Sequence, residues 1–267
     1  MSKININTLI VLFVVLFATV SCTSYKSVPY LQNSQDLKNI TQNSGLYDAR
    51  VQPKDLLSII VSSENQGAAD AYNLMVPRVY EQGNTSLTGM PTLQTYLVDN
   101  DGNIEFPTLG TLHIAGLTQS EIEDLILSKI SGSFTKKPVV TVRFADFKIS
   151  VLGEVASPGT YNIKNEKVNV FEALALAKDL TIHGRRDNVK LIREDITGKK
   201  EIHELNLNDV GILTSPYYYL QQNDILYVTP NKTKARNSDI GSSTTLWFSA
   251  TSIMISLTSL LYNILHN

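Results

Sequence analysis

The chain ends in an apolar segment that is crossed by a regular series of short polar residues. Successive polar positions are 4, 3, 4, 3 and 4 residues apart: Thr245, Ser249, Ser252, Ser256, Ser259 and Asn263. At about 100° per residue, these side chains share one narrow face of an α-helix. The other positions are mostly Leu, Ile, Phe, Met and Trp. The pattern therefore predicts an amphipathic, membrane-spanning helix over residues 244–266.

Strands are predicted where apolar residues recur at every second position. The first covers Leu57–Val61. Further strands flank two turn-forming clusters, Asp99–Asn103 and Asp195–Gly198, and a closing strand runs over residues 224–230. Residues 63–94 are polar and show no sustained period, so we expect a long loop or insertion there.

Two helices are predicted by capping boxes. In a capping box, the side chain of the first residue accepts a hydrogen bond from the backbone N–H three residues later, and the carboxylate of that later residue accepts one from the backbone N–H of the first. Thr118 pairs with Glu121 in the first box, and Asn169 pairs with Glu172 in the second. Strands and single helices in this order indicate an α+β fold with two small domains. We assign residues 46–146 to the first domain, 147–231 to the second, and 232–243 to a linker.

The N-terminus has the pattern of a secreted bacterial lipoprotein. Lys3 precedes the apolar run Leu9–Val20, which ends at Ser21-Cys22. We therefore expect a signal peptide over residues 1–21, with a lipid such as palmitate on Cys22, which is the single cysteine of the chain. Residues 22–45 form a polar tether. An ordinary signal peptide with an incidental cysteine, or an uncleaved anchor, is the alternative.

Charge and motifs exclude several classes of function. The net charge is −2, and no basic patch of the kind that binds nucleic acid is visible. The sequence has no nucleophile elbow, phosphate loop or zinc motif, and its four histidines show no ligand spacing. We expect no enzyme activity, no metal and no cofactor other than the lipid. Asp99 and Asp101 beside Gly102 favour a hairpin turn over a calcium loop.

Four motifs follow one another along the chain and together resemble a known family. They cover residues 47–61, residues 96–121, residues 153–161 with 184–189, and residues 221–230. The chain resembles the outer-membrane polysaccharide export proteins, whose export domain precedes a soluble-ligand-binding (SLBB) β-grasp domain. The positions that carry the resemblance are Tyr47, Pro53, Asp55, Asp101, Gly102, Pro107, Gly110, Gly116, Gly153, Pro158, Gly159, Asn223 and Asp224.

Some positions depart from the family pattern. Lys54 replaces a glycine between Pro53 and Asp55, so a type I turn is expected there. Lys178-Asp179 replaces a pair of glycines, and Asp is tolerated in the left-handed conformation. Pro158-Gly159 fits a type II turn in which Gly supplies the positive φ. One β-grasp domain is evident where larger members carry two, so we expect a shorter ring.

The resemblance implies a conduit that works by shape rather than catalysis. Family members form homo-oligomeric rings whose C-terminal helices build an α-helical barrel through the outer membrane. The implied cargo is a capsular or extracellular polysaccharide, and an inner-membrane polysaccharide co-polymerase is the implied partner. The alternatives are a non-channel periplasmic or surface lipoprotein that binds glycan through its β-grasp domain, and a eukaryotic protein with a glycolipid anchor.

The polar stripe of the C-terminal helix has two interpretations. Hydroxyl groups can line a wet lumen, or they can hydrogen-bond between neighbouring helices that approach closely. Trp247 and Tyr262, near opposite ends of the helix, suit interfacial anchors or plain packing. The run Tyr217-Tyr218-Tyr219 favours strand packing over a platform for sugar.

Overall fold

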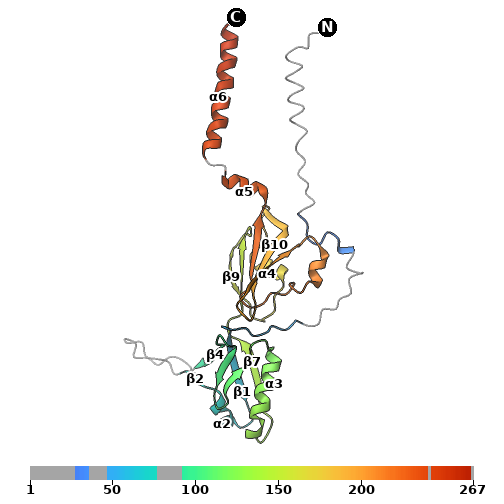
Figure 1. The fold of residues 1–267 in the computed structure, drawn as a ribbon, viewed down its shortest axis with the longest axis vertical. Helices are drawn as coiled ribbons and strands as arrows, with labels where there is room; N and C mark the ends of the chain where they lie inside the picture. Colours follow the sequence, from blue (N-terminus) through green and yellow to red (C-terminus); the bar gives the residue numbers. More distant parts are fainter. Residues whose placement is uncertain (1–27, 36–46, 77–91, 240–241, 266–267) are drawn as a thin grey trace, which may run out of the picture.

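The computed structural model describes residues 28–35, 47–76, 92–239 and 242–265. The signal peptide, Cys22 and most of the tether lie outside these residues. Two α+β units follow one another along the long axis of the molecule, and a helical C-terminus extends from the second unit (Figure 1). The predicted α+β class is confirmed.

The first unit is built on a three-stranded antiparallel sheet with the order β4-β1-β7. Its elements are β4 (Thr95–Leu97), β1 (Leu56–Ser62), β7 (Val139–Phe144) and helix α3 (Gln119–Ile130). Alternate residues of β1 are buried, as the sequence pattern predicts. The predicted capping box begins α3, because Thr118 Oγ1 accepts from Glu121 N at 3.3 Å and a Glu121 carboxylate oxygen accepts from Thr118 N at 2.7 Å.

Short elements complete the first unit. They are α2 (Gln66–Ala69), η3 (Asp70–Tyr72), β2 (Met75–Val76), β3 (Thr92–Leu93), β5 (Asn103–Phe106), β6 (Gly110–His113) and η4 (Ser131–Ser133). Where the segment 63–94 is described, short helices and two-residue strands therefore replace the irregular loop, whereas an insertion remains compatible with them. The Asn73 amide fixes this segment by bonding both Val61 N (2.9 Å) and Val61 O (2.7 Å). A side-chain contact of this kind leaves no periodicity in the sequence.

The second unit is a five-stranded mixed sheet with the order β11-β10-β12-β8-β9. Its elements are β8 (Lys148–Gly153), β9 (Gly159–Asn162), α4 (Val170–Leu176), β10 (Gly184–Glu194), β11 (Lys200–Leu205), η5 (Val210–Thr214) and β12 (Ile225–Pro230). The last strand lies in the centre of the sheet, parallel to β8. The hairpins β10-β11 and β8-β9 therefore lie on either side of β12. The second predicted capping box begins α4.

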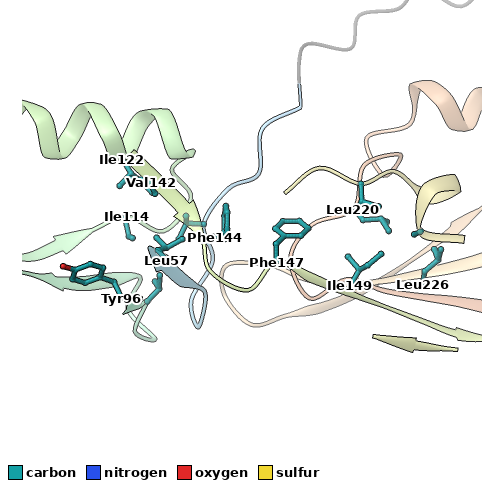
Figure 2. Close-up of a cluster of buried hydrophobic side chains, with 14 of the residues drawn as sticks. Leu57, Tyr96, Ile114, Ile122, Val142, Phe144, Phe147, Ile149, Leu220 and Leu226 are labelled. Atoms are coloured by element: carbon teal, nitrogen blue, oxygen red, sulfur yellow. The ribbon is translucent and has the colours of Figure 1, made fainter. Parts of the chain in front are cut away.

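The cores of the two units meet. Figure 2 shows Leu57, Ile122 and Val142 of the first unit on one side and Ile149 and Leu226 of the second on the other. Between them, the rings of Phe144 and Phe147 pack edge to face with centroids 5.7 Å apart. The buried apolar side chains of both units form one continuous cluster. Residues 47–76 and 92–230 are therefore packed as one body.

The predicted linker contains a helix. Lys232–Asp239 forms α5, and Ser242–Leu265 forms α6. The Asn231 side chain accepts from Lys234 N at 2.9 Å and so begins α5 in the manner of an N-cap. Helix α5 therefore occupies most of the segment that we assign to the linker.

Candidate functional site: the C-terminal helix and the domain junction

Helix α6 presents apolar side chains to solvent. Its 24 residues span about 36 Å at 1.5 Å per residue. Eight large apolar side chains are 52–75% exposed: Trp247, Phe248, Ile253, Met254, Ile255, Leu257, Leu260 and Ile264. An apolar surface of this extent marks a site of contact with another protein or with lipid.

The polar stripe lies on one face of α6. The side chains of Ser249, Ser252 and Ser256 are exposed, and their positions share an arc of about 60°. The side chains of Thr245, Ser259 and Asn263 lie outside the described residues, although their backbone belongs to α6. Thr251 lies on the opposite face, and its hydroxyl donates to Trp247 O at 2.5 Å. This off-stripe hydroxyl is satisfied by the helix itself.

Within the described part of the chain, no helix is both long enough and apolar enough to cross a membrane. The expectation of a membrane-spanning helix over residues 244–266 is therefore not supported.

Two similar turns lie at the domain junction, one before β1 and one before β12. In the first turn, Asp55 N donates to Gln52 O (3.1 Å) and an Asp55 carboxylate oxygen accepts from Gln52 N (2.7 Å). In the second, Asp224 N donates to Gln221 O (3.2 Å) and an Asp224 carboxylate oxygen accepts from Gln221 N (2.6 Å). The Gln52 amide donates to the Gln221 amide oxygen at 3.2 Å, so the two turns touch.

The third residue of each turn adopts a left-handed conformation. Lys54 has a φ of 74° and Asn223 a φ of 62°. The predicted type I turn at Pro53-Lys54 is therefore wrong. The backbone bonds of the turn hold Lys54 there, because Lys54 N also donates to Val98 O at 2.9 Å. By contrast, the expected left-handed conformation of Asp179 is confirmed, with a φ of 68°.

The two turn carboxylates have different surroundings. Asp224 is buried and receives a two-pronged contact from the Arg193 guanidinium, at 3.0 Å from Nε and 2.6 Å from Nη2. Asp55 is equally buried, but its Oδ1 has no hydrogen-bond partner within the described chain. Burial raises the pKa of Asp55 to about 7, and the Gln52 N–H opposes this shift.

Aromatic and polar contacts tie the first domain to the second. The Tyr47 ring stacks on Tyr219 with centroids 4.9 Å apart, and its hydroxyl donates to Leu220 O at 2.9 Å. Burial raises the pKa of Tyr47 to about 12. Glu166 accepts from Phe144 N at 2.9 Å and also from the Gln119 amide. Motif comparison singled out Tyr47, whereas nothing in the sequence pointed to Glu166.

The remaining motif residues of the first domain form turns. Asp99 accepts from Asp101 N (2.9 Å) and Asn103 N (2.8 Å), and Gly102 takes a φ of 79°. A Cβ on Gly102 would lie 2.4 Å from Ala115 Cβ, so glycine is required there. The tight turn is confirmed, although β4 and β5 belong to different sheets rather than to one hairpin. Pro107 lies in the next turn; Gly110 and Gly116 also have positive φ.

The expected type II turn at Pro158-Gly159 is wrong. Gly159 is the first residue of β9, opposite Val151, and is not among the residues with positive φ. Gly153 instead carries the positive φ, at 89°, and a Cβ there would lie 2.2 Å from Val228 O. Glycine in this motif therefore serves the close approach of the parallel strands β8 and β12.

No group of three or more metal-ligating side chains occurs among the residues that the structure describes. His203 stacks on Tyr217 instead, with ring centroids 3.8 Å apart. Tyr217, Tyr218 and Tyr219 are half-buried and lie in the segment before β12. Tyr30, which precedes the first domain, packs edge to face on Phe171. This docking of residues 28–35 on the second domain was not predicted, because it depends on contacts distant in sequence.

Comparison with known proteins finds two kinds of similarity. Residues 44–145 match the family described as polysaccharide biosynthesis/export protein. The EPS I polysaccharide export outer membrane protein EpsA of Ralstonia nicotianae (strain ATCC BAA-1114 / GMI1000) is 31% identical over 148 residues, which are 54% of this chain and 38% of that protein. The protein of the same name from Ralstonia solanacearum is 32% identical over 136 residues, 50% of this chain and 35% of that protein. The match thus spans less than half of these curated relatives.

Proposed function

We propose that the chain is an outer-membrane lipoprotein whose copies form a ring that conducts a capsular or extracellular polysaccharide out of the cell. The match of residues 44–145 to the family described as polysaccharide biosynthesis/export protein supports this proposal. The matched relatives are named as polysaccharide export proteins, which supports the prediction that the chain transports rather than catalyses. The ring, its cargo and an inner-membrane co-polymerase as partner belong to the proposal.

The observation that carries the proposal is the exposed amphipathic helix that follows an export domain. Full burial of a large apolar side chain stabilises by about 1.5–3 kcal/mol, and eight such side chains on α6 are more than half exposed. Helices from neighbouring copies, set side by side as the staves of a barrel, would cover part of this surface. The stripe would then face the lumen or the next stave, and the other apolar faces would meet lipid.

The domain junction supports the same proposal. A ring holds its lumen only if each copy is stiff, and the continuous core with the touching turns fixes one domain on the other. The proposed lipid on Cys22 would anchor each copy.

The alternative, a monomeric lipoprotein that binds glycan through its second domain, has one specific observation in its favour. A cavity of about 450 Å³ is lined by His203 and Tyr217, whose rings are stacked, together with Asp209. An aromatic face beside polar groups is a surface that suits a sugar ring. This reading predicts monomers.

Negative-stain microscopy of the detergent-purified full-length chain distinguishes the ring from the monomeric glycan-binding lipoprotein. We expect homogeneous rings from the wild-type chain and dispersed particles from a chain that ends at Asp239. Monomers of the wild-type chain would reject the ring and favour the glycan-binding alternative.

Labelling with a membrane-impermeant thiol reagent tests the stripe. We expect Ser252→Cys and Ser256→Cys to react in assembled rings, whereas Ile253→Cys, one position away and off the stripe, stays unreactive. If neither stripe cysteine reacts, the stripe belongs to the contact between staves. The denatured wild-type chain serves as a second control, because a reactive thiol at Cys22 would contradict its proposed modification.

A further inference from the structure

A cavity of about 490 Å³ opens where the second domain meets α5. Residues 28, 182, 184–187 and 231–232 line it. Asn231 N donates to His183 O at 2.8 Å, which holds the start of α5 against the start of β10. Figure 1 shows this end of the second domain on the side from which α5 and α6 extend.

One wall of the cavity holds a buried arginine to which the described residues offer no counter-ion. Arg186 is 8% exposed, and its Nε has no hydrogen-bond partner within the described chain. Its Nη1 reaches Gly184 O at a long 3.4 Å, and its guanidinium carbon lies 5.3 Å from the centre of the Tyr30 ring. No carboxylate forms an ion pair with it among the described residues. A buried, unpaired charge is costly, so the geometry leaves room for an anion.

The neighbouring charges favour an anion as well. Arg185 and Lys232 line the cavity with Arg186, whereas Asp187 contributes a carboxylate. That carboxylate is already bonded by Arg185, at 3.1 Å from Nε and 2.8 Å from Nη2. Three cationic side chains therefore surround one neutralised carboxylate.

The rim of the cavity is apolar. Ile182 is 76% exposed and Val28 is 44% exposed, and both line the cavity beside the cationic side chains. A ligand with an anionic head and an apolar body fits this combination better than a free anion does. Val28 also lies six residues after Cys22, a stretch of chain that reaches at most about 20 Å.

We propose that this cavity binds the phosphate of an anionic lipid headgroup, with Arg186 as the buried phosphate ligand and Ile182 against the glycerol and acyl carbons. Guanidinium groups suit phosphate because they donate two parallel hydrogen bonds. The lipid, as the source of this phosphate, rests on the proposed outer-membrane location. The site would hold the second domain against the membrane surface.

Calorimetric titration of the full-length chain in a non-ionic detergent tests the site. The probes are dihexanoyl phosphatidylglycerol, dihexanoyl phosphatidylcholine, inorganic phosphate and an oligomer of glucuronic acid. We expect phosphatidylglycerol to bind tightest. Arg186→Met should weaken the binding of phosphatidylglycerol at least tenfold, and Lys232→Met should weaken it a few fold. Lys200→Met, which removes an exposed cation elsewhere on the same hairpin, should leave it unchanged.

Ile182→Ser identifies the source of the phosphate, because this variant should weaken the binding of phosphatidylglycerol and leave the binding of inorganic phosphate unchanged. Equal affinity for phosphate and phosphatidylglycerol would overturn the proposal that the ligand is a lipid. Tighter binding of the glucuronic acid oligomer would assign the cavity to the polysaccharide. Unchanged binding in Arg186→Met would overturn the site; if that variant does not fold, Lys232→Met and Ile182→Ser decide. Failure here leaves ring formation intact, since rings are scored separately by microscopy.

Discussion

The turn before β1 and the turn before β12 have the same backbone form, but their buried aspartates have different surroundings. In both, an aspartate closes the turn onto a glutamine three residues earlier. Asp224 is met by the Arg193 guanidinium, whereas Asp55 is buried with one oxygen unpaired in the described chain. A buried carboxylate with a partner stabilises the fold as an ion, and one without a partner is more stable when protonated. The two turns also touch, so the junction combines a carboxylate that has a cationic partner with one that has none in the described chain.

The largest effect expected from this contrast is the loss of the Asp224 carboxylate. Asp224→Ala leaves Arg193, whose side chain is 12% exposed, without its counter-ion. Breaking a buried ion pair in this way costs about 3–5 kcal/mol of unfolding free energy. Denaturant unfolding of the detergent-purified chain measures the loss.

Asp187→Ala is the matched control for that variant. Asp187 receives a similar two-pronged contact from Arg185, but both side chains are more than 40% exposed. An exposed pair contributes about 0–1 kcal/mol. Equal losses in the two variants would show that burial of Asp224 is not what makes its pair important.

The pH dependence of stability distinguishes Asp55. Its pKa is about 7 in the folded chain and about 3.9 when unfolded. Below about pH 4 both states are protonated. Between about pH 4 and pH 7 only the unfolded state releases the proton, so stability falls by up to about 1.4 kcal/mol per pH unit. Above pH 7 the penalty is constant.

Asp55→Asn should flatten this decline, since the amide oxygen can still accept from Gln52 N and no proton is released. Burial raises the pKa of Asp224 too, against the opposing Arg193 charge, and so contributes in the same direction. The informative quantity is therefore the difference between the wild type and Asp55→Asn across the window. Parallel curves for the two chains would mean that Asp55 is ionised in the folded state.

Sequence reasoning succeeded where a feature depends on residues close together in the chain. Both capping boxes formed because each joins side chains and backbone three residues apart. The buried face of β1 followed from alternation alone. Contacts between residues distant in sequence could not be predicted in this way. Examples are the position of the last strand in the centre of the second sheet and the hydrogen bond by which Glu166 joins the two domains.

Sequence reasoning failed on turns whose conformation is imposed by distant contacts. At Pro158-Gly159 the residue types suit a type II turn, but pairing with Val151 extends Gly159 into β9. At Gln52–Asp55 a lysine takes the left-handed conformation because Val98 O, directly after β4, accepts its N–H. The cavity beside α5 was also missed, since it joins three segments that are distant in sequence: residue 28, residues 182 and 184–187, and residues 231–232.

The smallest effects concern the left-handed residue of each turn. A non-glycine side chain in this conformation costs roughly 1–2 kcal/mol, and asparagine tolerates it better than most. Lys54→Gly should therefore raise the unfolding free energy by about 1 kcal/mol, offset in part by the greater freedom of glycine in the unfolded chain. Asn223→Gly should change it by only a few tenths of a kcal/mol.

The two glycine variants together test whether the turns are equivalent in the backbone and differ only in their charges. Thermal unfolding at a pH below about 4 removes the contribution of Asp55 ionisation and isolates the backbone term. Lys129→Gly in α3, where φ is helical, is the control of opposite sign and should cost up to about 1 kcal/mol. If Lys54→Gly destabilises as Lys129→Gly does, then Lys54 is not strained, and its aliphatic stem contributes more to the junction than its backbone conformation costs.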